Sequence, residues 1–233
     1  MTASEDERSA TARRLANWGN EAGPAFAKAR DPARLATAVV TLHRRVDEVL
    51  ATTIEGHGVR VACARGCSYC CNLRVQVQPY EAFTLAAWLR KNFSAERLAQ
   101  VLGRLKANVA RTRELGEEQR KRANIACALL GEDGACSAYE ARPAQCRRYH
   151  STDLAPCKAF HATHDEAIEA AMHQAVAHNA DVIITQGRHA VRAAGLDDAS
   201  VDMNEALLEA LENPKAWRRW KDGKKPFVGR QER

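Results

Sequence analysis

Cysteine is the residue type in this sequence with the clearest capacity for chemistry. The chain has 233 residues, of which eight are cysteines. Four of them fall within nine residues, in the segment Cys63-Ala-Arg-Gly-Cys67-Ser-Tyr-Cys70-Cys71. The other four follow at Cys127, Cys136, Cys146 and Cys157. A lone cysteine usually serves as a small buried apolar side chain, but that role does not explain such clustering. The eight thiols therefore predict a metal centre.

The spacing of the first cysteines is typical of a zinc site. Zinc takes four soft donors in tetrahedral geometry, commonly as pairs separated by two to four residues. The run Cys63-x3-Cys67-x2-Cys70 has this spacing. All eight thiolates together would supply two four-cysteine sites or one polynuclear cluster with bridging sulfurs. Adjacent residues rarely direct both side chains at one ion, so Cys70 and Cys71 are expected to bind different metals or different edges of a cluster. We therefore expect a multinuclear centre.

Iron is the alternative metal, because iron–sulfur clusters are also held by closely spaced thiolates. The segment from Cys63 to Cys70 resembles the C-x3-C-x-aromatic-C loop of radical SAM enzymes, whose three cysteines hold a 4Fe–4S cluster that binds S-adenosylmethionine. The rest of the chain argues against that membership: it lacks regular βα alternation and a glycine-rich SAM strand, and Cys71 and the four later cysteines would be surplus. A thiol redox switch with a vicinal Cys70–Cys71 disulfide would also use adjacent cysteines.

The cysteine-bearing segments together resemble a known family, the CxxCxxCC or YkgJ-type cysteine-cluster proteins. The resemblance covers about residues 60–160 and rests on the order of the eight cysteines and on the segment Tyr139-Glu-Ala-Arg-Pro-Ala-Gln-Cys146-Arg-Arg-Tyr149. The spacing Cys63-x3-Cys67 is one residue longer than the family's name suggests. The resemblance implies zinc or iron binding by all eight cysteines and no settled reaction.

One relative of this family suggests an enzyme. A related cysteine domain occurs in flagellin lysine N-methylases, where an iron–sulfur centre is implicated in SAM-dependent methyl transfer. The resemblance therefore implies, as an alternative to plain metal binding, a SAM-dependent protein lysine methyltransferase. A metal chaperone or a thiol redox sensor would also use clustered cysteines. Whether the chain is an enzyme stays open at this point, and no catalytic residue is assigned.

Charge does not point to nucleic acid. The formal net charge is +6 with cysteine counted as neutral, but eight ligating thiolates would change it to −2, and two divalent ions would restore +2. Several arginines close to the cysteines in sequence could stabilise thiolates. They are Arg60, Arg65, Arg74, Arg142, Arg147 and Arg148. Metal ions are the expected partners, and a protein partner or substrate is possible as well. The sequence does not indicate the oligomeric state.

The spacing of apolar residues predicts a mainly helical fold. Aromatic residues make up 6% of the chain and hydrophobic residues 45%, with abundant alanine, which favours packed helices over a β-sandwich. We expect helices over residues 4–18, 32–54, 79–89, 94–109, 168–183 and 203–211, with an exposed helix or connector over 116–124. A short strand is expected over 73–78, and a small hairpin over 126–138 would bring Cys127 and Cys136 close together. The fold class is thus mainly α: one helical domain with a small β-hairpin or strand element and cysteine-rich loops.

The chain divides into three segments around the cysteines. Residues 1–56 form N-terminal helices packing on the body, 57–162 form the eight-cysteine core, and 163–233 form C-terminal helices and a basic tail. In the tail, Trp217 and Trp220 are expected to dock on the body rather than to touch phosphate or lipid. No apolar run approaches the length of a membrane span and the N-terminus is charged, so a reducing cytoplasm is the expected location.

Three histidines lie near the last two cysteines in sequence. They are His150, His161 and His164. They could act as auxiliary ligands, but eight sulfurs leave no need for them. We expect each to be a surface or helix-capping residue.

Overall fold

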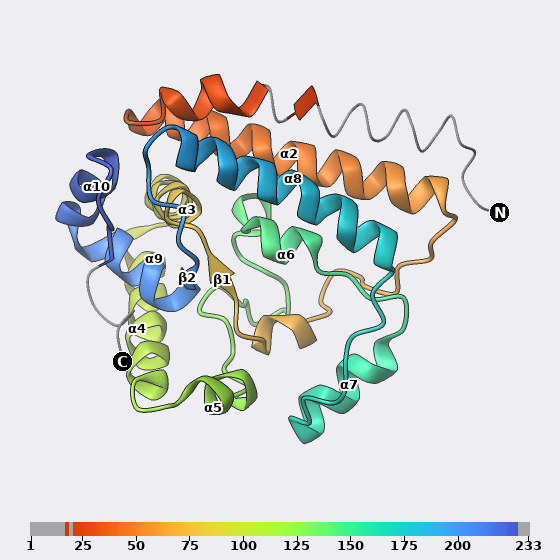
Figure 1. The fold of residues 1–233 in the computed structure, drawn as a ribbon. Helices are drawn as coiled ribbons and strands as arrows, with labels where there is room; N and C mark the ends of the chain where they lie inside the picture. The colour runs from red at the N-terminus through yellow and green to blue at the C-terminus, as the bar shows by residue number, and fades with distance from the viewer. Residues whose placement is uncertain (1–16, 19–20, 228–233) are drawn as a thin grey trace.

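The computed structural model describes residues 17–18 and 21–227 of the chain (Figure 1). The fold is mainly helical, as the sequence predicted, and its longest helices are α2 (Pro32–Gly56) and α8 (Gln174–Ala193). These two helices lie side by side and antiparallel, and they make the most extensive contact between any two elements described (Figure 1). The helix predicted over 4–18 falls outside the described residues, except for residues 17 and 18, which are helical.

Helix α2 forms where the sequence predicted it, because its ends and its buried face are both well specified. The Asp31 carboxylate accepts hydrogen bonds from the backbone N–H groups of Ala33 and Arg34, at 3.1 and 3.0 Å, and a proline occupies the first turn. Leu42 is fully buried and faces α8, where a Cβ added to Gly187 would lie 3.0 Å from its side chain. Glycine at that position therefore allows the two long helices to approach closely.

A second group of helices packs beside this pair. It contains α3 (Pro79–Asn92), α4 (Ala95–Thr112), α9 (Met203–Glu212) and α10 (Pro214–Lys221). Helix α9 contacts both α3 and α4. As predicted, the Ser94 hydroxyl caps α4 by accepting a hydrogen bond from the Arg97 N–H at 3.2 Å. The docking of the tail is also confirmed, because Trp220 is fully buried and the rings of Trp217 and Trp220 lie 5.4 and 5.8 Å from that of Phe83.

The β structure is smaller than the sequence suggested. Strands β1 (Gln76–Val77) and β2 (Val201–Asp202) form one antiparallel pair, so only two residues of the predicted strand over 73–78 are in a ladder. The predicted hairpin is reduced to an isolated bridge between Leu130 and Cys136, supported by a hydrogen bond of 2.8 Å from the Gly131 N–H to the Ala135 carbonyl. The turn is where it was expected, but regular strands do not flank it.

The remaining short elements carry or adjoin cysteines. They are the 3-10 helices η1 (Tyr69–Asn72) and η2 (Tyr139–Ala141) and the helices α5 (Glu117–Arg122), α6 (Ala144–Arg148) and α7 (Leu154–Thr163). The sequence did not predict α7. No helix in residues 17–18 and 21–227 has the length and apolar character needed to cross a membrane.

The prediction of a long helix over 168–183 was wrong about where the helix begins. Helix α8 begins only at Gln174, and the preceding residues run as an irregular segment. In that segment the Ala171 carbonyl accepts a hydrogen bond of 2.8 Å from the Thr152 N–H, and the His173 N–H donates one of 3.1 Å to Nε2 of His150. These distant partners take the place of helical ones, which sequence periodicity alone does not reveal.

Asp198 links the end of α8 to the loop that follows it. Its carboxylate accepts hydrogen bonds from Nε of Arg188 at 3.2 Å and from Nη2 of Arg192 at 2.9 Å. Partial burial opposes ionisation, but the hydrogen bonds and charges of Arg192 and Arg188 outweigh it and lower the pKa of Asp198. A lowered pKa in the folded state means that the stabilisation is present above the pKa of an unfolded aspartate and is lost as the pH falls through the folded value.

We therefore expect Asp198→Asn to lower the free energy of unfolding slightly at neutral pH. The difference from the unmodified chain should shrink as the pH falls below about 4, where an unfolded aspartate becomes protonated. Urea denaturation across this pH range measures the difference. Asp222→Asn is the control for removing a carboxylate elsewhere in the fold. Asp153→Asn would not serve as a control, because the Asp153 side chain caps α7. A difference that grows toward acid pH would contradict the assignment.

Candidate metal centre

The eight cysteines come from separate segments of the chain. Cys63 and Cys67 lie in the loop before η1, and Cys70 and Cys71 lie within η1. Cys127 and Cys136 flank the turn at residues 131–134, Cys146 lies on α6 and Cys157 lies on α7. All eight are free thiols; Cys63 is exposed and the other seven are partly buried. The first four were expected to lie together, whereas the placement of the other four depends on the fold.

Backbone contacts join the first cysteine cluster to the later cysteines. The Cys127 N–H donates a hydrogen bond of 2.8 Å to the Cys71 carbonyl. The turn after Cys127 also packs against the first loop, because a Cβ added to Gly134 would lie 2.9 Å from the Gly66 carbonyl oxygen. Gly134 has φ +73°, which glycine adopts without strain, so both the conformation and the close approach require it. The two halves of the cysteine pattern are thus held together by main-chain structure.

Three thiols lie near enough to the exposed Cys63 to affect its pKa. Burial raises the pKa of Cys63, a hydrogen bond with the Ser151 backbone lowers it, and three neighbouring thiols raise it further. Those thiols belong to Cys67, Cys70 and Cys157. The Cys63 Sγ lies 4.0 Å from the Ser151 carbonyl oxygen. The loop is held by the Ala62 N–H, which donates a hydrogen bond of 2.8 Å to the same carbonyl. Cys157 therefore joins the first cluster, although it lies far from it in sequence.

A second group of thiols lies deeper. Burial raises the pKa of Cys127 to about 11, with smaller contributions from Cys136 and Cys70. Burial likewise raises the pKa of Cys146 well above its ordinary value, and the thiols of Cys127, Cys136 and Cys70 add to the effect. The thiols of Cys127 and Cys136 are thus near enough to interact electrostatically, as expected if the turn between them folds the chain back.

Cys70 is common to both groups. Its pKa is raised, first by a hydrogen bond with the Cys71 thiol and then by burial. The Arg142 guanidinium acts in the opposite direction and lowers the pKa of both Cys70 and Cys136. Arg142 lies 3.6 Å above the ring of Tyr139, which fixes its direction. Among the arginines that sequence proximity singled out, Arg142 is thus the one placed to offset thiolate charge.

Four of the other arginines near the cysteines pair with aspartates. Arg65 lies 3.7 Å from Asp133 and Arg74 lies 3.6 Å from Asp202. Arg147 and Arg148 pair with Asp47 and Asp181. Their charges are therefore largely neutralised within the fold.

Cysteine sulfur is a suitable donor for zinc or iron, but the eight thiols do not lie in the positions of a metal site. Within the part of the chain that the structure describes, no three His, Cys, Asp or Glu side chains converge closely enough to hold an ion as they stand. Thiols with raised pKa values are protonated at neutral pH, and a bound cation would favour their thiolate forms. Thiolates are the preferred soft ligands of zinc and of iron–sulfur clusters. Metal binding by these residues would therefore require the thiols to lose protons and to draw together.

The histidines near the last cysteines serve the fold. His164 has φ 57° and ends α7, so the capping prediction is confirmed for it. His150 is buried rather than on the surface, because its ring lies between the Arg148 carbonyl and the His173 N–H, at 3.0 and 3.1 Å. His161 packs its ring against Tyr69, with 5.6 Å between centroids. This last contact holds α7 beside η1.

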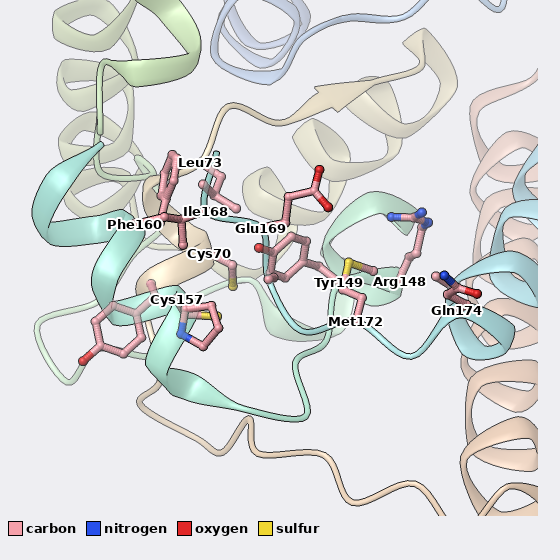
Figure 2. Close-up of a pocket in the computed structure, with 14 residues that line it drawn as sticks. Cys70, Leu73, Arg148, Tyr149, Cys157, Phe160, Ile168, Glu169, Met172 and Gln174 are labelled. Carbon is pink, nitrogen blue, oxygen red and sulfur yellow. The ribbon is translucent and has the colours of Figure 1, made fainter. Parts of the chain in front are cut away.

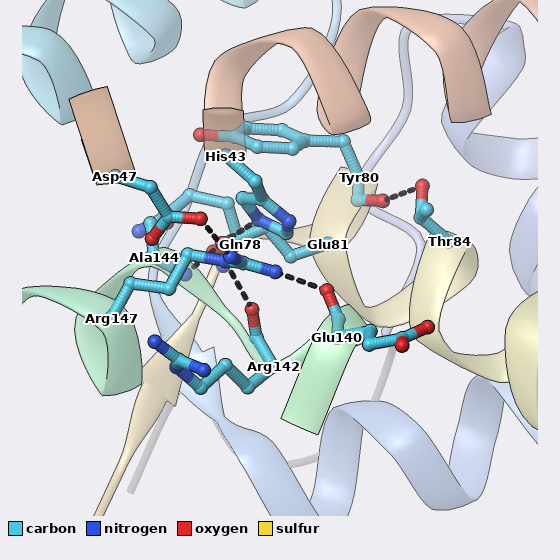
Figure 3. Close-up of polar contacts among 10 residues, drawn as sticks. All are labelled: His43, Asp47, Gln78, Tyr80, Glu81, Thr84, Glu140, Arg142, Ala144 and Arg147. Carbon is cyan, nitrogen blue, oxygen red and sulfur yellow. Dashed lines mark hydrogen bonds and ion pairs between the residues drawn. The ribbon is translucent and has the colours of Figure 1, made fainter. Parts of the chain in front are cut away.

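A buried polar network positions α6 and its cysteine (Figure 3). Glu81, only 1% exposed, accepts hydrogen bonds from the Ala144 N–H at 2.7 Å and the Gln78 N–H at 3.3 Å, and its carboxylate lies 3.1 Å from Nε2 of His43. Because Ala144 is the first residue of α6, Glu81 fixes the start of the helix that presents Cys146.

Arg147 completes this network from α6 (Figure 3). It pairs with Asp47 of α2 and donates hydrogen bonds to the carbonyls of Arg142, at 2.9 Å, and Glu140. Nothing in the sequence indicated the roles of Glu81 and His43. The signal for Arg147 lay in the segment from Tyr139 to Tyr149, whose residues build the support for Cys146 as well as supplying it.

A cavity of about 460 Å³ opens beside the thiols of Cys70 and Cys157 (Figure 2). Its mainly apolar walls include Tyr69, Leu73, Tyr149, Phe160, Ile168 and Met172. Burial raises the pKa of Tyr149 to about 12, with the nearby thiols of Cys157, Cys70 and Cys63 adding to the effect, so its phenol is neutral at physiological pH. The sequence did not predict this cavity, since part of its wall was assigned to a helix.

Comparison with known proteins agrees with the cysteine pattern. Residues 62–174, slightly less than half of the chain, match the family model CxxCxxCC, whose description is "Putative zinc- or iron-chelating domain". Searches of curated proteins and of solved structures found no match. The matched range contains all eight cysteines, the Glu81 network partners on α6 and most of the cavity wall. Residues 62–174 of this chain are therefore a domain of the CxxCxxCC family.

Proposed function

We propose that this protein binds zinc or iron through its eight cysteines in one multinuclear centre. The observation that carries the proposal is the main-chain hydrogen bond between Cys127 and Cys71, which joins the two halves of the cysteine pattern. The family's description supports zinc or iron as the metal. Because thiolates from distant segments would share the same ions, the bound metal would cross-link η1, α6 and α7.

Within this centre we assign the linking role to Cys70. Its thiol neighbours the group of Cys63, Cys67 and Cys157 as well as the deeper group. A thiolate can bridge two metals, so one sulfur at this position would serve both groups. Cys71, adjacent in sequence, would bind on another edge of the centre, and the Arg142 guanidinium would offset part of the thiolate charge.

The functions open to such a centre differ in what the metal does. A structural centre would be required for folding, whereas a chaperone would exchange its metal reversibly and a redox sensor would form disulfides. A SAM-dependent protein lysine methyltransferase would need an iron–sulfur centre that responds to S-adenosylmethionine. Clustered cysteines are more often metal ligands in a reducing compartment than elsewhere, so this function is consistent with a cytoplasmic location.

Anaerobic purification followed by elemental analysis and a visible spectrum tests the proposal. We expect zinc or iron in near-stoichiometric amount, and we expect Cys70→Ser to lose more metal than Cys63→Ser because the Cys70 thiol neighbours both groups. Ser68→Ala is the matched control from the same loop, since the Ser68 side chain makes no capping hydrogen bond. Freshly purified protein without metal would refute the proposal, and full metal retention in Cys70→Ser would refute the linking role.

The same samples distinguish a structural centre, a metal carrier and an enzyme. Unfolding on chelation indicates a structural centre, and reversible loss without unfolding indicates a carrier. A colourless zinc protein would exclude the iron–sulfur enzyme. If iron–sulfur absorption is present, a change in the EPR spectrum of the reduced cluster on addition of S-adenosylmethionine would support methyl transfer, and no change would exclude it.

A further inference from the structure

The cavity beside Cys70 and Cys157 is larger than a metal ion requires. Its volume of about 460 Å³ falls within the range of about 300–1,000 Å³ that is typical of small-molecule sites. In Figure 2 the side chains of Cys70 and Cys157 lie toward one end, those of Arg148 and Gln174 lie toward the other, and Glu169 lies between. The cavity therefore has room for an organic molecule that extends away from the thiols.

Hydrogen bonds tie one part of the cavity wall to the rest of the fold. This part is formed by residues 168–172, the irregular segment that precedes α8. Hydrogen bonds from Thr152 to the Ala171 carbonyl, through both its N–H and its hydroxyl at 2.8 Å, hold the segment in place. The His173 N–H, bound to the buried His150, fixes its far end. The cavity is thus shaped before any ligand enters.

The positive charge on the cavity wall is paired within the fold, whereas the negative charge is not paired in the part of the chain that the structure describes. Arg148 is neutralised by Asp181, with Nε and Nη2 lying 2.5 and 2.7 Å from the two carboxylate oxygens. Glu169 is exposed at the wall and has no ion-pair partner among the described residues. The nearby thiolates of a loaded centre would add negative charge, a contribution that rests on the proposed function. The wall therefore favours a cation over an anion.

The apolar lining adds to this selectivity. Tyr69, Tyr149 and Phe160 contribute aromatic rings, and Ile168 and Met172 contribute aliphatic surface. Aromatic faces attract organic cations, and aliphatic surface favours an alkyl chain. A ligand with a positively charged head and a short hydrocarbon body matches both features.

We propose that this cavity binds an organic ammonium ion, with its charged nitrogen near Glu169 and its alkyl chain against the aromatic wall. Cys70 and Cys157 line the same cavity, so the ammonium site adjoins the proposed metal centre, and Glu169, which would bind the charged nitrogen, is not one of the proposed metal ligands. The proposal assigns a ligand class and leaves the reaction, if any, to the centre.

A titration of the metal-loaded full chain with three isosteric probes tests this inference. The probes are n-butylammonium, 1-butanol and butyrate, and binding is followed by NMR. We expect n-butylammonium to bind most tightly and butyrate most weakly. Glu169→Gln should weaken n-butylammonium binding by about fivefold, the upper end of the range for an exposed ion pair, and should leave 1-butanol binding unchanged. Glu166→Gln is the matched control, because Glu166 pairs with Arg122 at 3.0 Å and does not line the cavity.

Several results would overturn the inference. Equal or tighter binding of butyrate, no binding of n-butylammonium, or an unchanged preference in Glu169→Gln would each do so. Elemental analysis of the same samples separates this failure from that of the metal centre. Loaded protein that ignores n-butylammonium contradicts this inference alone, whereas metal-free protein that binds it contradicts the proposed function alone.

Discussion

Replacing Glu81 with alanine is expected to lower the free energy of unfolding by about 3 kcal/mol or more and to reduce the metal content of the purified protein. The carboxylate is almost fully buried and accepts hydrogen bonds from the N–H groups of Ala144 and Gln78, beside the His43 ring. Its removal would leave these donors buried without an acceptor. The start of α6 would lose its attachment, and Cys146 would lose its fixed place among the deeper thiols.

Urea denaturation and elemental analysis measure the two effects separately. Glu55→Ala is the matched control, since Glu55 is an exposed glutamate near the end of α2. Glu81→Gln keeps the size of the side chain but places an amide NH2 where an oxygen accepted a hydrogen bond, so we expect an intermediate loss. A folded Glu81→Gln variant with reduced metal would show that Glu81 positions the centre. Full metal content in a folded Glu81→Ala variant would contradict that role.

Trp220→Ala is expected to destabilise the fold by about 3–5 kcal/mol while leaving the metal content of the folded protein unchanged. Trp220 is fully buried against Phe83, and its indole N–H donates a hydrogen bond of 2.8 Å to the Asp197 carbonyl. The substitution would leave a cavity between α10 and α3 and an unpaired carbonyl. None of these contacts involves a cysteine.

The comparison of this variant with Glu81→Ala is informative because both lose stability. If metal content follows stability in general, then both should lose metal, and Glu81 would have no particular role at the centre. Retention of metal by Trp220→Ala at a similar loss of stability would identify the Glu81 effect as local. Trp220→Phe, which keeps most of the apolar contact, should recover most of the lost stability. A Trp220→Ala variant as stable as the unmodified chain would contradict the docking of the tail.

The elements predicted best from the sequence are those whose specification is local. Helices α2 and α4 combine an apolar face with a capping Asp31 or Ser94 directly before the first turn, so their boundaries could be read from neighbouring residues. The start of α8 could not be predicted from neighbouring residues. Ile168 and Met172 continue the helical spacing of apolar residues, yet hydrogen bonds to Thr152 and His150 hold this segment in another conformation.

In the candidate centre, too, some contacts follow from nearby residues and others depend on the packing of distant segments. The first cysteines lie together because only a few residues separate them, and a short turn brings the segment of Cys136 back to Leu130, three residues after Cys127. The approach of Cys157 to Cys63 depends on the packing of α7 against η1, which local sequence does not specify. Glu81 resembles any acidic residue in the first turn of a helix, and its contact with Ala144 becomes visible only in three dimensions.

The hydrogen bond between Cys127 and Cys71 has a consequence for how the protein is made. It closes a loop that contains α3 and α4, so the two sets of cysteines meet only after both helices have left the ribosome and folded back. A nascent chain that extends only to the end of α4 carries the first four cysteines without their partners. Metal captured at that stage would rest on a short, exposed loop, and its final coordination would await synthesis of Cys157. If the eight cysteines bind metal as proposed, the complete ligand set would exist only after Cys157, the last of them in sequence, has been synthesised.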